Sequence, residues 1–129
     1  YLSKVWLSKQ ISSNTRTEIF FDEINLFPTA QTILQDILTE CRKYSFIPTI
    51  SLHFLNQCNK KCKDAILSSG CSFILLAGAD VKCFEELRGL FYKEGYTETD
   101  MLNLKRFHAL CLIRNEEKGY SAFIVKLPK

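Results

Sequence analysis

The feature that most constrains this chain is a short apolar run that ends in two adjacent carboxylates. Residues 18–23 read Glu-Ile-Phe-Phe-Asp-Glu. Three bulky apolar residues without polar alternation are typical of a strand in a parallel sheet that is covered on both faces. In open α/β sheets, functional groups gather at the carboxyl ends of the strands. The run therefore predicts a central strand over residues 18–22, with Asp22 and Glu23 at its functional end.

The two acids allow two interpretations. An ordinary strand that runs into a solvated loop gives the same pattern. The pattern also fits the second acidic motif of P-loop NTPases, in which the Asp belongs to the Mg²⁺ shell and the Glu orients or deprotonates the attacking water. Residues elsewhere in the chain must distinguish the two.

Length and charge set the broad class. The chain has 129 residues, the size of one ordinary domain, and a net charge of +3 that is too small to indicate nucleic-acid binding. The basic cluster at residues 60–63 favours a solvated helix face. No apolar run approaches the ~20 residues of a transmembrane helix. The chain begins at Tyr1 without a Met or a signal-peptide pattern, so we expect a piece of a longer protein.

The cysteines indicate a reducing, cytosolic environment. Their scattered positions do not suggest a secreted disulfide framework. Cys58 and Cys62 are four residues apart and could form half of a metal site, but no second half-site accompanies them. Two reduced, packed thiols are favoured. The six cysteines are Cys41, Cys58, Cys62, Cys71, Cys83 and Cys111.

Apolar periodicity and breaker residues predict an α/β fold: a mostly parallel sheet with flanking helices, right-handed crossovers and a C-terminal antiparallel hairpin, all in a single domain over residues 1–129. Pro48 is expected at the first position of its strand, and Asp80 as a helix N-cap. The predicted order is a helix or helix end over 1–10, a polar loop over 12–17, strands over 18–22, 48–53 and 72–77, helices over 30–44, 57–68 and 81–94, a short helix or turn from residue 97, and hairpin strands over 107–114 and 120–127.

Three more residues are candidates for chemistry. His53 lies near the end of the second predicted strand and would meet Asp22 and Glu23 if the strands are parallel neighbours; otherwise it is a satisfied histidine beside the core. Arg42 is either a helix C-terminal cap or surface charge, or an arginine finger that inserts into a neighbouring subunit. His108, in a hairpin strand, has no such partner and is expected to be structural.

One motif is missing from the sequence. No GxxxxGK[ST] pattern occurs, so these residues cannot cradle ATP phosphates through a P-loop of their own. If the chain belongs to an ATPase, we expect its P-loop upstream of Tyr1.

Several short motifs, taken in order, resemble the C-terminal half of a RecA-like motor. They are most similar to ATPases of type IV secretion and conjugation, especially coupling proteins of the TraG/TraD type. The resemblance extends over nearly the whole chain from Glu18, and the order and spacing of the motifs carry it. The motifs are residues 19–24, Glu-Cys-Arg-Lys-Tyr at 40–44, residues 48–55, Asp-Ala-Ile-Leu at 64–67, the strand 73–75 leading to Ala79-Asp80, and the closing residues 106–110 and 123–128.

The resemblance implies a role for each candidate residue. Asp22 would be the Mg²⁺-associated carboxylate, acting through water, and Glu23 the catalytic one. Arg42 would be the arginine finger. His53 takes the position of the family's usual Gln, a departure that changes geometry and titration. A second departure is Val81 after Asp80, where the family tends to have Ala.

For the whole protein the resemblance implies a hexameric ATPase that uses ATP and Mg²⁺ to move DNA or DNA–protein complexes toward a secretion channel. Its partners would be DNA, relaxosome proteins and channel proteins. A missing N-terminal segment would anchor it at the cytoplasmic face of the bacterial inner membrane. The isolated piece is expected to be inactive and to hold no nucleotide. The resemblance does not distinguish a coupling protein from the other large ATPase of the secretion system. The alternative is a non-catalytic recognition module that docks relaxosome or channel proteins.

Overall fold

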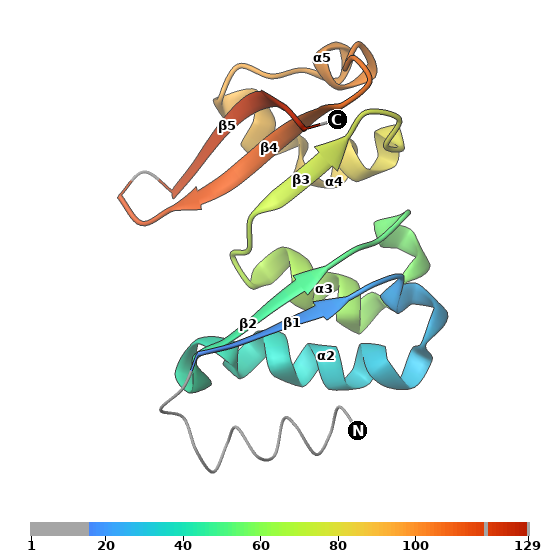
Figure 1. The fold of residues 1–129 in the computed structure, drawn as a ribbon, viewed down its shortest axis with the longest axis vertical. Helices are drawn as coiled ribbons and strands as arrows, with labels where there is room; N and C mark the ends of the chain where they lie inside the picture. Colours follow the sequence, from blue (N-terminus) through green and yellow to red (C-terminus); the bar gives the residue numbers. More distant parts are fainter. Residues whose placement is uncertain (1–15, 118, 129) are drawn as a thin grey trace. The chain divides into compact units, whose positions relative to one another are not determined.

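The computed structural model describes residues 16–117 and 119–128, which belong to two compact units that divide between Ser69 and Gly70. Each unit has a sheet of its own (Figure 1). The helix predicted over residues 1–10 and most of the predicted polar loop lie outside the described residues. The expectation of a single domain over residues 1–129 stays a prediction.

The first unit is built on a parallel strand pair joined by a helical crossover. The strands run in register from Thr17 opposite Phe46 to Phe21 opposite Ile50. Pro28 opens the crossover helix, where its missing N–H costs no hydrogen bond. The elements are β1 (Thr17–Phe21), η1 (Ile24–Leu26), α2 (Pro28–Glu40), η2 (Cys41–Tyr44), β2 (Phe46–Ile50), η3 (Leu55–Gln57) and α3 (Lys60–Ser68). The core of the unit includes Leu34, Ile37, Phe46, Cys62 and Ile66.

Two expectations about these strands were wrong. Pro48 is the third residue of β2 and not the first. In the described sheet β2 pairs with β1 alone, and an edge strand tolerates a proline that cannot donate to the ladder. Strand β1 is also not covered on both faces, because Phe20 is 75% exposed while Phe21 is only 8% exposed. A two-stranded sheet buries one face here and leaves the alternate side chains in contact with solvent.

The second unit is an antiparallel sheet packed against a helix. Its strands are β3 (Phe73–Leu76), β4 (His108–Asn115) and β5 (Gly119–Lys126), in the order β3-β4-β5. The predicted α/β class and C-terminal hairpin are confirmed, with His108 opposite Lys126 and Asn115 opposite Gly119. The predicted parallel pairing is found between β1 and β2. Strand β3 forms where it was expected, but it pairs with β4 and the pairing is antiparallel.

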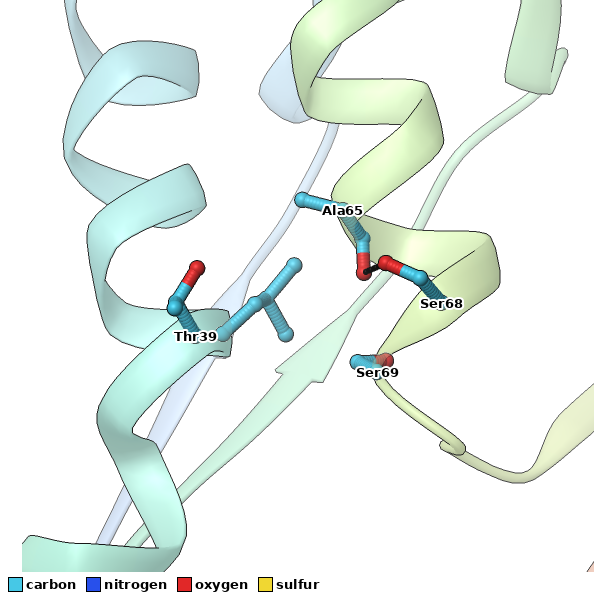
Figure 2. A pocket seen from close by; sticks show the side chains of 5 residues that line it. Thr39, Ala65, Ser68 and Ser69 are labelled. Atoms are coloured by element: carbon cyan, nitrogen blue, oxygen red, sulfur yellow. Dashed lines mark hydrogen bonds between the residues drawn. The ribbon is translucent and has the colours of Figure 1, made fainter.

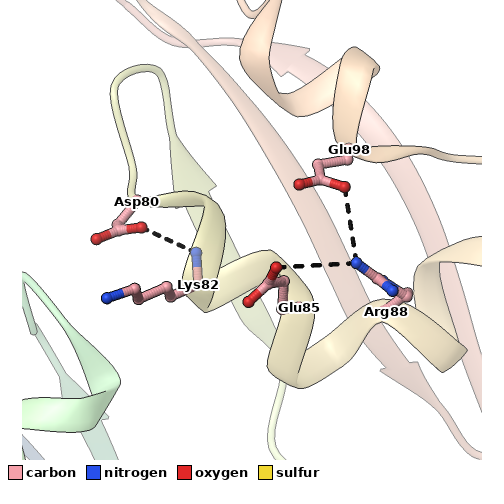
Figure 3. Close-up of polar contacts among 5 residues, drawn as sticks. All are labelled: Asp80, Lys82, Glu85, Arg88 and Glu98. Atoms are coloured by element: carbon pink, nitrogen blue, oxygen red, sulfur yellow. Dashed lines mark hydrogen bonds and ion pairs between the residues drawn. The ribbon is translucent and has the colours of Figure 1, made fainter.

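The helices of the second unit follow the capping signals in the sequence. They are α4 (Val81–Lys93) and α5 (Glu98–Leu102). Asp80 is the N-cap of α4, as predicted, and accepts a hydrogen bond of 2.9 Å from the backbone of Lys82. Figure 3 shows this cap together with Arg88 of α4, whose guanidinium lies 3.9 Å from Glu85 and 3.7 Å from Glu98. Among the described residues, no helix is long and apolar enough to cross a membrane.

Candidate active site

The parallel register brings the ends of β1 and β2 to one edge of the first sheet. Phe21 and Ile50 are paired, and Ser51 continues the ladder by donating to the Phe21 carbonyl at 2.8 Å. Beyond this point His53 Nε2 lies 2.7 Å from Glu23 Oε1. The predicted meeting of Glu23 and His53 is confirmed. Asp22, an exposed residue, immediately precedes Glu23 at the same edge.

Glu23 adopts a backbone conformation that is rare for its residue type. Its φ of 49° and ψ of 46° lie in the left-handed region, which disfavours any residue with a Cβ. The turn is held by Leu26, whose N–H donates to the Glu23 carbonyl at 3.0 Å, and η1 follows directly. Strained backbone of this kind is concentrated at functional sites, so the outlier adds to the case for Glu23.

The contact between Glu23 and His53 is open to solvent. The His53 side chain is 68% exposed and the Glu23 side chain 42%. Exposed pairs are screened by water and contribute only about 0–1 kcal/mol to stability. A carboxylate oxygen can only accept, so in this contact Nε2 carries the proton. The arrangement orients one carboxylate oxygen and leaves the second available to hydrogen-bond water.

A buried glutamine ties together the two loops that carry these residues. Gln31 of α2 is only 3% exposed. Its Nε2 donates to the Asn25 carbonyl at 3.2 Å, and its Oε1 accepts from the Asn59 N–H at 2.8 Å. Asn25 follows Glu23 by two residues, and Asn59 closes the segment that runs from His53 to α3. Gln31 is therefore a positioning residue for both strand ends.

Sequence reasoning missed Gln31 because a glutamine was not expected on an apolar helix face. The signal was present in the spacing: Gln31, Leu34 and Leu38 follow one another at i, i+3 and i+7, which places them on one stripe. All three are buried. A polar residue on a buried stripe needs hydrogen-bond partners, and Asn25 and Asn59 are suitable neighbours in the adjoining loops.

The other two residues singled out from the sequence, Arg42 and His108, have no described contact with Glu23 or His53. The backbone of Arg42 lies in η2, while its side chain lies outside the described part of the structure, so the arginine finger stays a prediction. His108, in β4, is half-buried, and its Nδ1 lies 3.1 Å from the Arg106 carbonyl. The structural role expected for His108 stays a prediction.

The described residues contain no cluster of three or more His, Cys, Asp or Glu side chains that could hold a metal ion. Mg²⁺ differs from metals with protein-built cages, since it keeps several waters and uses one or two carboxylates together with substrate phosphates. A single exposed carboxylate such as Asp22 fits that pattern. Its role toward Mg²⁺ stays a prediction.

A cavity elsewhere in the first unit lacks the chemistry of an active site. It has a volume of about 280 Å³ and is lined by Leu38, Thr39, Ala65, Ser68 and Ser69. Figure 2 shows three hydroxyl side chains around it, and each donates to a carbonyl of its own helix: Thr39 to Gln35, Ser68 to Ala65 and Ser69 to Ile66. No titratable side chain lines the cavity, so it lacks the acid–base groups that lie at the sheet edge.

Taken together, the parallel pair with its acidic strand end and the C-terminal antiparallel hairpin form the α/β fold expected from the resemblance to type IV secretion ATPases. The solved structure of VirB4 of Thermoanaerobacter pseudethanolicus has this fold, with a TM-score of 0.70, 22% sequence identity and 99% of the present chain covered. The chain spans 35% of the length of that VirB4 chain. No family model matches the sequence, and no significant match was found among the curated proteins.

Proposed function

We propose that this chain is part of a type IV secretion ATPase and carries the hydrolytic half of its nucleotide site. The main support is the 2.7 Å contact between Glu23 and His53, at the carboxyl ends of paired parallel strands. The likeness to VirB4, itself a type IV secretion ATPase, supports the same class. We take a VirB4-type ATPase as the first candidate and a TraG/TraD-type coupling protein as the second.

In this proposal each residue at the sheet edge has one task. Asp22 holds Mg²⁺ through water, and Glu23 orients and deprotonates the water that attacks the γ-phosphate. His53 donates from Nε2 to one Glu23 oxygen, so that the other oxygen faces the water. The sequence has no P-loop pattern. We therefore assign the binding of the ATP phosphates to another part of a longer protein.

Assembly completes the proposed site. Arg42 follows α2 and would supply a guanidinium to the active site of a neighbouring subunit, where it stabilises charge on the transferring phosphoryl group. That role requires a ring of subunits, which we propose to be a hexamer. The whole protein would work at the cytoplasmic face of the inner membrane and move DNA or protein, with relaxosome and channel proteins as partners.

The central test is Glu23→Gln in the full-length protein. We expect ATP binding to persist and the hydrolysis rate to fall by about 10²-fold or more, because a positioned base contributes roughly that much. The matched control is Glu18→Gln, which makes the same change at the amino end of the same strand, where Glu18 pairs with Arg16 at 2.9 Å. Unchanged hydrolysis in Glu23→Gln would remove the proposed role.

The role of Arg42 has its own test. Arg42→Ala and Glu23→Gln proteins are each expected to be inactive. If Arg42 acts across a subunit boundary, mixing the two restores part of the activity, because some interfaces then combine an intact Arg42 with an intact Glu23. A mixture as inactive as its components would contradict the finger assignment and leave the role of Glu23 unaffected.

The second candidate function is a non-catalytic recognition module, and the absent P-loop pattern favours it. It predicts that the chain alone captures relaxosome or channel proteins, and that Glu23→Gln leaves ATP hydrolysis of the full-length protein unchanged. The hydrolysis assay therefore separates the two candidates, since only the first requires Glu23.

A further inference from the structure

The β1–β2 pair of the first unit has one open face. The parallel register places Phe20 opposite Thr49 and Glu18 opposite Ile47. Paired residues of neighbouring strands point to the same face, so these four side chains lie together, and all four residues are exposed. Phe20 is 75% exposed and Ile47 38%, whereas Phe21, on the other face, is only 8% exposed. The pair therefore presents two bulky apolar side chains to solvent on one side.

The opposite face is already covered by helices of the same unit. Helix α2 packs against both α3 and β2. Leu34 and Ile37 of α2 are fully buried, and Phe46 of β2 belongs to the same core. Parallel strands in α/β proteins are buried under helices on both faces. Among the described elements of this unit, α2 and α3 supply one helical layer, and the Phe20 face has room for a second.

The open face ends at the proposed hydrolytic edge. Glu23 follows β1 by two residues and lies 2.7 Å from His53. A P-loop consists of a strand, a phosphate-binding turn and a helix whose N-terminus points at the phosphates. For the γ-phosphate to meet a water beside Glu23, that helix N-terminus has to lie at the same edge. A helix that begins there and packs on this sheet runs over the open face, because α2 and α3 occupy the other.

Charge and length agree with this orientation. Asp22 and Glu23 place two carboxylates at the carboxyl end of β1, where they complement the positive end of a helix dipole and the lysine of a P-loop. At the amino end Arg16 balances Glu18, with 2.9 Å between the guanidinium and the carboxylate. The 5 residues of β1 extend over roughly 16 Å, which a helix of about 11 residues spans.

We propose that the open face around Phe20 binds the helix that follows the P-loop of the longer protein. This inference rests on the proposed function and names the surface through which the two halves of the nucleotide site meet. The helix runs antiparallel to β1, with its N-terminus beside Glu23 and with apolar residues at every third or fourth position over Phe20 and Ile47. Its binding covers Phe20 and brings the P-loop next to the hydrolytic edge.

The test is disulfide scanning in the full-length protein. Phe20→Cys is combined with single cysteines along the P-loop helix, in a Cys41→Ser background because positions 20 and 41 share the tryptic peptide 17–42. After mild oxidation, mass spectrometry should find position 20 crosslinked to helix positions three or four residues apart. The control Phe27→Cys replaces a 57% exposed residue of the same peptide, directly before α2, and should give no such set. No crosslink from position 20, or a crosslinked dimer on a denaturing gel, would overturn the proposal.

A second measurement separates this proposal from the catalytic role of Glu23. Phe20→Ser should weaken ATP binding by the full-length protein about tenfold or more, because burial of one aromatic side chain contributes at least that much. Phe20→Leu, which keeps an apolar side chain, should bind ATP nearly as well as the unchanged protein, and so should the control Phe27→Ser. Unchanged ATP binding in Phe20→Ser would overturn the helix contact and leave the hydrolysis test of Glu23→Gln unaffected.

Discussion

Gln31 of α2 and Phe84 of α4 are both buried helix residues, one in each unit, but they make different contacts. Gln31 uses its amide to bridge the Asn25 carbonyl and the Asn59 N–H. Phe84 uses a ring that stacks on Phe91, with 5.0 Å between the centroids. One contact fixes the position of two loops and the other fills space. The first unit has two loops to position, and the second has an apolar core to fill.

The comparison extends to the central strands. In the second unit, four consecutive residues of β4, from Ala109 to Leu112, are buried, and apolar packing fixes the antiparallel sheet. In the first unit the parallel pair ends at Glu23 and His53, both substantially exposed. A solvent-exposed pair of side chains cannot be fixed by apolar packing. It has to be positioned through the backbone behind it, and Gln31 provides that support.

The largest expected effect is loss of the apolar core in the second unit. Phe84→Ala should lower the free energy of unfolding by about 3–5 kcal/mol, because it removes a fully buried ring and leaves a cavity. Urea unfolding followed by circular dichroism would measure this. The control Tyr92→Ala, at a half-exposed ring of the same helix, should cost clearly less. Equal losses would mean that packing around Phe84 is not what holds the unit.

A smaller effect is expected for the buried amide. Gln31→Leu should lower the free energy of unfolding by about 1–3 kcal/mol, because the Asn59 N–H and the Asn25 carbonyl lose their hydrogen-bond partner. It should also alter the NMR signals of His53. The control is Gln35→Leu, the same change one turn later in α2, where a less buried side chain predicts a change of about 0.5 kcal/mol or less. Unchanged His53 signals in Gln31→Leu would remove the positioning role.

The strained turn should give a difference of about 1 kcal/mol in the free energy of unfolding between two variants that both lack the Glu23 carboxylate. Glu23→Gly should be more stable than Glu23→Ala by about that amount, because only glycine avoids the Cβ clash at positive φ. Phe107, with φ 60° in the second unit, offers the same Gly and Ala pair as a control. Equal stability of the two Glu23 variants would argue against backbone strain at this position.

The smallest effect concerns the exposed cap of α5. The Thr97 N–H and hydroxyl each donate to the Asp100 carboxylate at 2.7 Å and lower the pKa of Asp100. A lowered pKa contributes stability that is fully present above the ordinary Asp pKa of about 3.9, and that is lost as the pH falls through the lowered value. Asp100→Asn should remove this part of the acid dependence. Identical acid unfolding curves for Asp100→Asn and the unchanged protein would contradict the assignment of this acid dependence to Asp100.

The sequence predicted the sheet edge better than the sheets. Acids and a histidine after two apolar strands were enough to expect Glu23 and His53 together, because parallel neighbours end at one edge. The apolar strand at 73–76 could not reveal its partner, since apolar residues suit parallel and antiparallel pairing alike. The left-handed turn at Glu23 was equally hidden, because nothing in a glutamate signals positive φ.

The turn at Glu23 also bears on mutational tolerance. A library of all substitutions at this position should be ranked differently by two selections. Selection for folded protein should enrich Gly and Asn, the residues that suit positive φ. Selection for ATP hydrolysis in the full-length protein should retain Glu alone. Opposed rankings at one codon would separate what the backbone prefers from what the chemistry requires.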